Sequence, residues 1–167
     1  MPFQFSNESI FDCGADILVN PVNCLGISGA GLAKEFALRF PDAQKKFVDA
    51  CRNGYVVIGR PYFECTMDAT HIIRICYFPT KHHFRDRSML PWIRYGLHKL
   101  RDYAVEHAEE YYTSCHPITL AIPALGCGLG GLDFDSVWEE IESALSDVSS
   151  LLNIIVFPPK GKIFEGR

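Results

Sequence analysis

The amino-acid sequence predicts an α/β fold in which one sheet is covered by helices on both faces. The first observation is that strand-like and helical segments alternate along the chain, as they do in this layered architecture. The second is that two short apolar strands, at 16–20 and 118–122, each lead through a glycine-rich loop into a helix. Loops at the carboxyl ends of strands are where ligands bind in such sheets. The two glycine loops are therefore the first candidates for a binding site.

Residue types and spacing predict the individual elements. β-branched and aromatic residues mark the strands, and apolar residues at helical spacing mark the helices. Ser88 can cap one helix, and either Asp133 or Asp135 can cap another. The expected strands are 3–5 (an edge strand), 16–20 (ending at Pro21), 55–58, 62–67, 71–78, 118–122 and 153–157. The expected helices are about 32–40, 42–52, 88–107 and 134–148.

Length and composition fit one globular domain, and we expect residues 1–167 to form a single domain. No apolar run approaches the roughly 20 residues of a membrane span, and the first residues do not resemble a signal peptide, so we expect a cytoplasmic protein without membrane contact. The seven cysteines include no C-x-x-C pair, which predicts neither a disulfide framework nor a metal site. A net charge of −4 argues against broad nonspecific binding to nucleic acid but leaves room for one basic patch.

The stretch 118–134, ITLAIPALGCGLGGLDF, is the most informative part of the chain. A short apolar strand ends at Pro123, which has no N–H to donate, and glycines stand at 126, 128, 130 and 131. Glycine lets backbone N–H groups approach an anion closely, so the loop is either a phosphate-binding nest or a flexible tight turn. The loop before the first helix has Gly26, Gly29 and Gly31. One diphosphate cradle explains both loops better than two unrelated turns.

Polar side chains follow two of the predicted strands. Asn20 and Asn23 flank the end of the first one, where an Asn either caps the next turn or holds a sugar hydroxyl. Lys81 follows Thr80 at the end of a long strand. Such a lysine is a solvated loop charge, a phosphate partner or, when desolvated, an amine nucleophile.

The residues after Lys81 form the one local cationic cluster, made of His82, His83, Arg85 and Arg87. This cluster is either an ordinary surface loop or a contact to a polyanionic substrate. Neighbouring histidines point to different faces of an extended chain, so we expect no metal site here.

Four stretches in the same order resemble the macrodomain family and together cover nearly the whole chain: ADILVNPVN, GISGAGLAKEF, ALGCGLGGLDF and VFPPKG. The resemblance implies a three-layer α/β/α fold with a mixed, roughly six-stranded sheet, and ADP-ribose as the ligand. Within the family, FPTKHHFR and GCGLGGLDF are most similar to the DarG-type antitoxin macrodomains, which remove ADP-ribose from thymidine bases in DNA. They are also similar to the terminal ADP-ribose protein glycohydrolase, which uses a lysine.

The resemblance implies a role for each matching residue. Lys81 would be the catalytic lysine, engaging the anomeric carbon directly or through a ring-opened Schiff base, and Asn23 would lie at the distal ribose. The cluster His82, His83, Arg85 and Arg87 would contact the modified nucleic acid. The other implied ligand-binding residues are Gly29, Ala30, Gly31, Leu32, Thr80, Gly126, Cys127, Gly128, Leu129 and Gly130.

The function implied by the resemblance is a lysine-dependent ADP-ribosyl glycohydrolase that acts on thymidine-linked ADP-ribose in DNA. It would need no cofactor and no metal, act as a monomer, and have an ADP-ribosyltransferase toxin as a partner. The alternatives are a noncatalytic ADP-ribose reader, or a hydrolase of protein-linked ADP-ribose or of small ADP-ribose metabolites such as the 1″-phosphate.

The sequence departs from the family pattern at three positions. Ser9 stands where many macrodomains have an Asp that binds adenine, so Glu8 or Asp16 would have to replace it. Ala33 stands where another branch of hydrolases has an acidic residue, which argues against that branch. Gly130 stands where the lysine-using protein glycohydrolase has an aspartate, and in this it resembles the DNA-directed group. The chain also lacks the C-terminal domain of full-length antitoxins, which argues against toxin neutralisation by sequestration.

Overall fold

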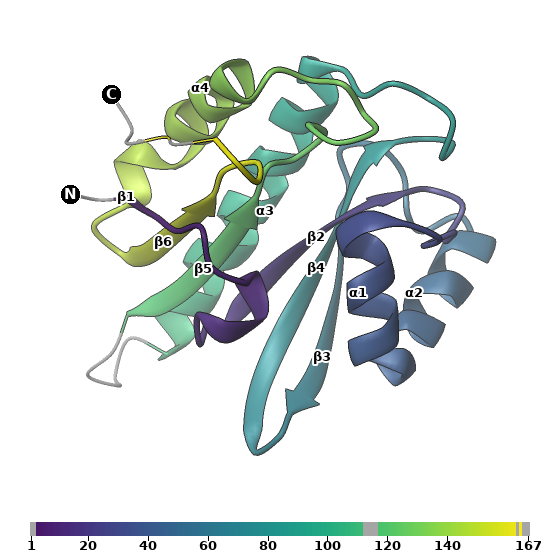
Figure 1. The fold of residues 1–167 in the computed structure, drawn as a ribbon. Helices are drawn as coiled ribbons and strands as arrows, with labels where there is room; N and C mark the ends of the chain where they lie inside the picture. Colours follow the sequence, from purple (N-terminus) through teal and green to yellow (C-terminus); the bar gives the residue numbers. More distant parts are fainter. Residues whose placement is uncertain (1–2, 112–116, 163, 165–167) are drawn as a thin grey trace.

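The computed structural model describes residues 3–111, 117–162 and 164, and is built around one mixed six-stranded sheet (Figure 1). The strands are β1 (Phe3–Phe5), β2 (Ile17–Asn23), β3 (Tyr62–Asp68), β4 (His71–Lys81), β5 (Ile118–Pro123) and β6 (Leu152–Phe157). Their order in the sheet is β1-β6-β5-β2-β4-β3. All neighbours are parallel except β3 and β4, which form an antiparallel hairpin at one edge. The expected mixed sheet is therefore confirmed.

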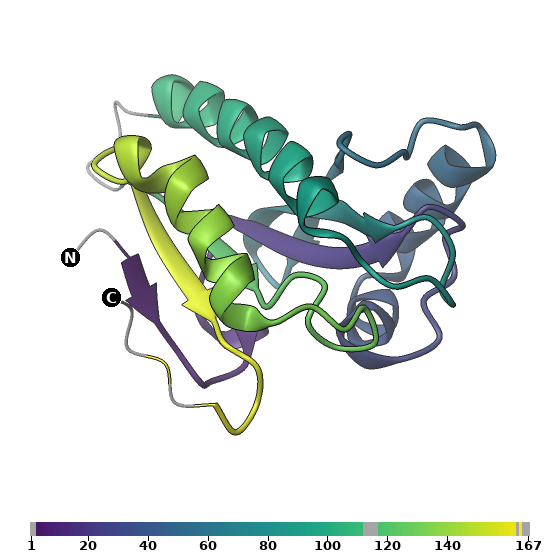
Figure 2. The same ribbon diagram turned by 90° about the horizontal axis from the view of Figure 1, so that it is seen from above.

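Helices cover both faces of this sheet and complete three layers (Figure 2). The helical elements are α1 (Gly31–Arg39), α2 (Pro41–Arg52), α3 (Leu90–Tyr111) and α4 (Phe134–Leu145), with short 3-10 turns η1 (Ile10–Asp12) and η2 (Ser146–Val148). α1 and α2 pack on one face, and α3 and α4 on the other.

Side chains of β4 alternate between the two apolar cores, one on each face of the sheet. Ile75 and Tyr77 lie in the apolar cluster of α1 and α2, whereas Cys76 and Phe78 lie in the cluster of α3 and α4. Because successive side chains of a strand point to opposite faces, a fully buried strand is apolar at nearly every position. Tyr77 stacks on Phe47 of α2 with the ring centroids 4.3 Å apart, which fixes that helix against the sheet.

Three local expectations differ from the structure. Residues 55–58 do not form a strand, since their one ladder contact is an isolated bridge from Val57 to Arg60. β2 does not end before Pro21 but continues to Asn23. Its pairing with β5 covers only Ile17 and Leu18. Beyond the proline it pairs with β4 alone. Ser88 does not cap α3, because its buried hydroxyl has no hydrogen-bond partner in the described part of the chain and the helix begins at Leu90.

The residue that caps α4 is one of the two that the sequence predicted. Asp133 is the residue that caps α4, and its carboxylate accepts a hydrogen bond from the Ser136 N–H at 3.2 Å. Six cysteines in the described part of the chain are free thiols, and Cys115 lies outside it. Within the described ranges no helix is long and apolar enough to cross a membrane, and no group of three His, Cys, Asp or Glu is arranged for a metal ion.

Candidate active site

The two glycine loops and Lys81 meet at the edge of the sheet where the parallel strands end. β2 and β4 are neighbours in the sheet, and Asn23 pairs with Lys81 across them after a register shift at Val22. The next residues stay together, because the Cys24 N–H donates to the His82 carbonyl oxygen at 3.0 Å. Both β2 and β5 feed their glycine loops into this edge (Figure 1). Adjacent strand ends thus place two loops and one lysine side by side, as expected for a ligand site in this fold.

The first glycine loop ends at the amino terminus of α1, which has no side-chain cap. Ala30 is the N-cap residue, and its methyl group cannot accept a hydrogen bond from the first-turn amides. The N–H groups of Gly31 and Leu32 belong to this first turn, where an α-helix leaves its donors without intrahelical partners. Uncapped donors and the positive end of the helix dipole favour an anion at this point.

The second glycine loop is a series of tight turns closed by backbone hydrogen bonds. The Gly131 N–H donates to the Gly128 carbonyl oxygen at 3.1 Å, and the Leu132 N–H donates to the Gly126 carbonyl oxygen at 2.9 Å. Between these bonds, the N–H groups of Gly128, Leu129 and Gly130 donate to no acceptor among the described residues. Three successive free donors are the backbone arrangement that binds phosphate oxygens.

Position 130 has no room for a side chain, so a glycine is required there. A Cβ atom at this position would collide with the Ser88 Oγ atom and lie 2.6 Å from the Gly126 carbonyl oxygen. The Ser88 N–H also donates to the Gly130 carbonyl oxygen at 3.0 Å, so Ser88 joins the segment after Lys81 to the second loop. The aspartate of the lysine-using protein glycohydrolase could not occupy position 130 without moving Ser88.

Lys81 is buried and has no acidic partner. The residue is only 9% exposed, and its Nζ atom donates to the Phe84 carbonyl oxygen at 3.0 Å. Within the described part of the chain no carboxylate pairs with this ammonium group. The solvated-loop interpretation of Lys81 is therefore wrong, and the amine is held in place at the end of β4.

Asn23 uses its carboxamide to shape the first loop. Its Nδ2 atom donates to the Ile27 carbonyl oxygen at 2.8 Å, and its Oδ1 atom accepts from the Leu25 N–H at 3.0 Å. This is the turn-capping role that the sequence left open beside the sugar-binding role. Thr80 is also structural here, because its hydroxyl donates to the Val22 carbonyl oxygen at 3.4 Å.

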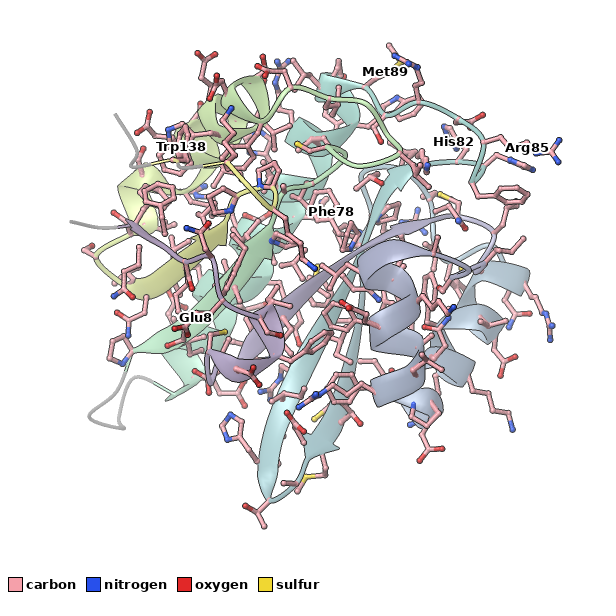
Figure 3. All side chains as sticks on the ribbon, viewed as in Figure 1. Glu8, Phe78, His82, Arg85, Met89 and Trp138 are labelled. Atoms are coloured by element: carbon pink, nitrogen blue, oxygen red, sulfur yellow. The ribbon has the colours of Figure 1, made fainter. Side chains whose placement is uncertain are left out.

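The cationic cluster is a compact turn beside the second loop. The His83 N–H donates to the Asp86 Oδ2 atom at 3.0 Å, and the Arg85 N–H reaches the His83 Nδ1 atom at 3.1 Å. The His82 ring packs edge-on against Trp92 with centroids 5.0 Å apart. His82 and Arg85 lie beyond the carboxyl end of β4 (Figure 3). The Arg87 guanidinium lies next to Gly131, so the cluster borders the second glycine loop.

The candidate adenine-binding residues are spread over different parts of the fold. The Ser9 hydroxyl caps η1 by accepting from the Phe11 N–H at 3.3 Å. Asp16 precedes β2, and its carboxylate accepts from the Thr119 N–H at 2.9 Å. It therefore lies at the opposite end of β2 from the glycine loops. Glu8 is exposed and lies far from His82 and Arg85 in Figure 3.

Cysteine chemistry is disfavoured at this edge of the sheet. Burial raises the pKa of the Cys127 thiol to about 12, and the nearby Asp133 carboxylate adds to the rise. Burial also raises the pKa of Cys24 and of Cys51 to about 11. Because the thiolate is the nucleophilic form, none of these three is activated near neutral pH.

Two residues of this region were not identified as site residues from the sequence. Ser88 is a spacer behind the second loop, and Phe84 supplies the carbonyl that holds Lys81. Asn20 is fully buried opposite Tyr77, and both polar atoms of its carboxamide lack partners among the described residues. Asn20 therefore does not have the capping role that the sequence offered for it, and no sequence pattern marked Ser88 or Phe84 as part of the site.

Comparison with known proteins identifies the family and several relatives of this chain. Residues 19–141 match the Macro domain family. The "DNA ADP-ribosyl glycohydrolase" of Mycobacterium tuberculosis is 31% identical over 157 residues, which is 94% of this chain and 42% of that protein. The chain thus spans less than half the length of such curated relatives. An "ADP-ribose 1″-phosphate phosphatase" of Saccharomyces cerevisiae is 26% identical over 162 residues, 86% of this chain and 89% of that protein.

Solved structures give the same result. The macrodomain of Mycobacterium tuberculosis DarG superposes with a TM-score of 0.85 at 31% identity, covering 94% of this chain and 97% of that one. Thermosipho africanus DarTG, solved in complex with ADP-ribose, superposes with a TM-score of 0.80 at 27% identity, covering 98% of this chain and 43% of that one. The family match, the identity and the shared architecture together show that this chain belongs to the Macro domain family and is related to the DarG DNA ADP-ribosyl glycohydrolases.

Proposed function

We propose that this protein is a lysine-dependent ADP-ribosyl glycohydrolase that removes ADP-ribose from thymidine bases in DNA. The observation that carries the proposal is the position of Lys81, which is buried at the strand ends where both glycine loops begin and has no carboxylate partner among the described residues. Two relatives of this chain, in Mycobacterium tuberculosis and Thermus aquaticus, are named "DNA ADP-ribosyl glycohydrolase".

The two glycine loops would hold the diphosphate of ADP-ribose. The free amides of Gly128, Leu129 and Gly130 offer three donors on one side, and the uncapped first turn of α1 offers others. We propose that Gly29, Ala30, Gly31, Leu32, Thr80, Gly126 and Cys127 complete the binding site. Asn23 would reach the distal ribose only by exchanging one of its present bonds within the first loop.

Lys81 would carry the chemistry. Its amine adds to the anomeric carbon as the bond from that carbon to the thymine nitrogen breaks, and the released base takes up a proton. Opening of the ribose ring leaves a Schiff base, which water hydrolyses to give ADP-ribose and the free amine. The burial of Lys81 and its bond to the Phe84 carbonyl oxygen support this role, because they hold the Nζ atom in one position at the end of β4.

Incubation with thymidine-ADP-ribosylated single-stranded DNA tests the proposal. The native chain should release ADP-ribose over many turnovers, and Lys81→Ala should lose at least about 10²-fold in rate while still binding free ADP-ribose in calorimetry. Lys45→Ala, a change at an exposed lysine on α2, is the matched control and should keep full activity. Unchanged turnover in Lys81→Ala would contradict the proposal.

A noncatalytic reader of ADP-ribose is the second candidate. It is favoured by the absence of an acidic side chain at Ala33 and Gly130, where hydrolases of other macrodomain branches have one. A reader would bind free ADP-ribose and release nothing from modified DNA, modified protein or ADP-ribose 1″-phosphate. Multiple turnovers on any of the three would exclude it, and the identity of that substrate would define the reaction.

The biological setting is part of the same proposal. We propose a single domain that acts as a monomer in the cytoplasm, without a cofactor, against a partner ADP-ribosyltransferase toxin. A relative in Thermosipho africanus is a "DNA ADP-ribosyl transferase-DNA ADP-ribosyl glycohydrolase fusion protein", 34% identical over 131 residues. Protection of cells that express such a transferase, lost in Lys81→Ala, would support this setting.

A further inference from the structure

We infer that Phe84 and Arg85 form a stacking platform for an unpaired nucleobase that flanks the modified thymidine in single-stranded DNA. The inference rests on the proposed function and specifies the form of its substrate. The platform lies on the turn that follows Lys81, between the end of β4 and the start of α3 (Figure 3).

Phe84 is an aromatic side chain at the surface. It is 39% exposed, whereas the phenylalanines at 36, 47 and 78 are fully buried. Its ring contacts two neighbours: the His83 ring, with centroids 4.2 Å apart, and the Arg85 guanidinium, 5.6 Å from the ring centre. An exposed ring flanked by a cation is the arrangement on which nucleobases stack in proteins that bind single strands.

The platform is held close to the reacting centre. The Phe84 carbonyl oxygen accepts from Lys81 Nζ at 3.0 Å, so its backbone is in contact with the proposed nucleophile. The turn itself is fixed by two bonds between His83 and Asp86: His83 N–H to Asp86 Oδ2, and Asp86 N–H to the His83 carbonyl oxygen, each 3.0 Å. A rigid aromatic residue near the scissile bond is placed to contact the base beside the one that leaves.

The charge around Phe84 favours a nucleic acid strand. His82, Arg85 and Arg87 are exposed, and the one acidic residue of this turn, Asp86, has its carboxylate bonded to the His83 backbone. The whole chain has a net charge of −4, so this cationic turn is a local exception. Cations that follow the phosphates, together with an aromatic residue that stacks a base, are the two parts of a single-strand site. Recognition of a protein substrate that carries ADP-ribose would need neither these cations nor this aromatic residue.

The test compares two substrates that carry the same thymidine-linked ADP-ribose: an oligonucleotide of about ten bases and the isolated ADP-ribosylated nucleoside. Stacking is worth about 1–3 kcal/mol per base. Phe84→Ala should therefore reduce the ratio of kcat/KM for the oligonucleotide over the nucleoside by about 5- to 150-fold, mainly through KM. Phe84→Tyr should restore the ratio. Ile72→Ala, which truncates an exposed apolar residue at the other end of β4, is the matched control and should leave it unchanged.

A second measurement is independent of turnover. Binding of a labelled, unmodified oligonucleotide at low salt should weaken in Phe84→Ala and recover in Phe84→Tyr. An unchanged substrate ratio and unchanged binding in Phe84→Ala would overturn the stacking platform. If Arg85→Ala lost binding while Phe84→Ala kept it, the contact would be purely electrostatic and the stacking platform would likewise be overturned. Failure of the native chain to release ADP-ribose from either substrate, with Phe84-dependent binding retained, would overturn the proposed reaction and leave the platform.

Discussion

Gly130 and Ser88 show how single residues set the chemistry of the second loop. The Ser88 hydroxyl fills the space that any side chain at position 130 would need, and the Ser88 N–H holds the Gly130 carbonyl oxygen. The loop therefore presents backbone amides to a ligand and has no room for a carboxylate. In the proposed reaction Lys81 must act without an acidic partner from this loop.

Replacing Gly130 with Ala should destabilise the protein. The added Cβ atom would collide with Ser88 Oγ and crowd the Gly126 carbonyl oxygen, and such overpacking costs about 1–3 kcal/mol. Gly128→Ala is the matched control, because its Cβ atom would have no neighbour within 4 Å. Urea unfolding gives the two free energies, and calorimetry should show weaker ADP-ribose binding in Gly130→Ala. Equal stability of the two variants would contradict the steric explanation.

At the scale of elements, α3 is held unusually close to β4. A Cβ atom on Gly96 would clash with the Phe78 ring, and the two Cε atoms of that ring would be 2.8 Å away. The absence of a side chain on Gly96 thus lets the helix rest directly on the aromatic ring. The same helix starts at Leu90, just after the turn that contains Phe84, so its position also determines where that turn lies.

Gly96→Ala should therefore destabilise the protein by about 1–3 kcal/mol despite the higher helix propensity of alanine. Phe78→Leu in the same chain removes the atoms that clash, and the double variant should be more stable than the sum of the single changes predicts. Thermal or urea unfolding of the four proteins measures the coupling. Strict additivity would show that the close contact does not limit the approach of α3.

At the scale of the whole molecule, buried thiols link stability to pH. The pKa of Cys127 is raised to about 12, and those of Cys24 and Cys51 to about 11, chiefly by burial. In the unfolded chain a thiol ionises near pH 8.5. Above that pH the unfolded state binds fewer protons than the folded state, so the free energy of unfolding decreases as pH rises. These thiols contribute their full stabilisation below about pH 8.5 and lose it progressively toward pH 11 to 12.

The urea concentration at the midpoint of unfolding should therefore decrease as the pH rises from 8 to 10. Cys127→Ala should reduce the size of that fall, because it removes the thiol with the largest shift of the three that we compare. Activity on the proposed substrate should resist brief treatment with iodoacetamide at pH 7, since the Cys127 thiol stays protonated there. A decrease of the same size in Cys127→Ala and in the native chain would contradict the role of this thiol.

Local residue patterns by themselves determined the α/β class, both glycine loops and most helix boundaries. α2 begins at Pro41, one residue before its expected start, and Asp133 caps α4, because these effects depend on atoms within one helical turn. The choice between Asp133 and Asp135 could not be made locally, since both stand at suitable positions. It depended on the exact start of the helix.

Tertiary structure decided what depends on residues far apart in the chain. The pairing of Asn23 with Lys81 spans 58 positions and follows from β2 and β4 being neighbours in the sheet. The same packing buries Lys81 and places Ser88 behind Gly130. It also leaves residues 55–58 outside the sheet despite their strand-like composition, because Val57 bridges to Arg60 and not to a strand of the sheet. Burial and pairing are properties of the assembled layers, so no local pattern encodes them.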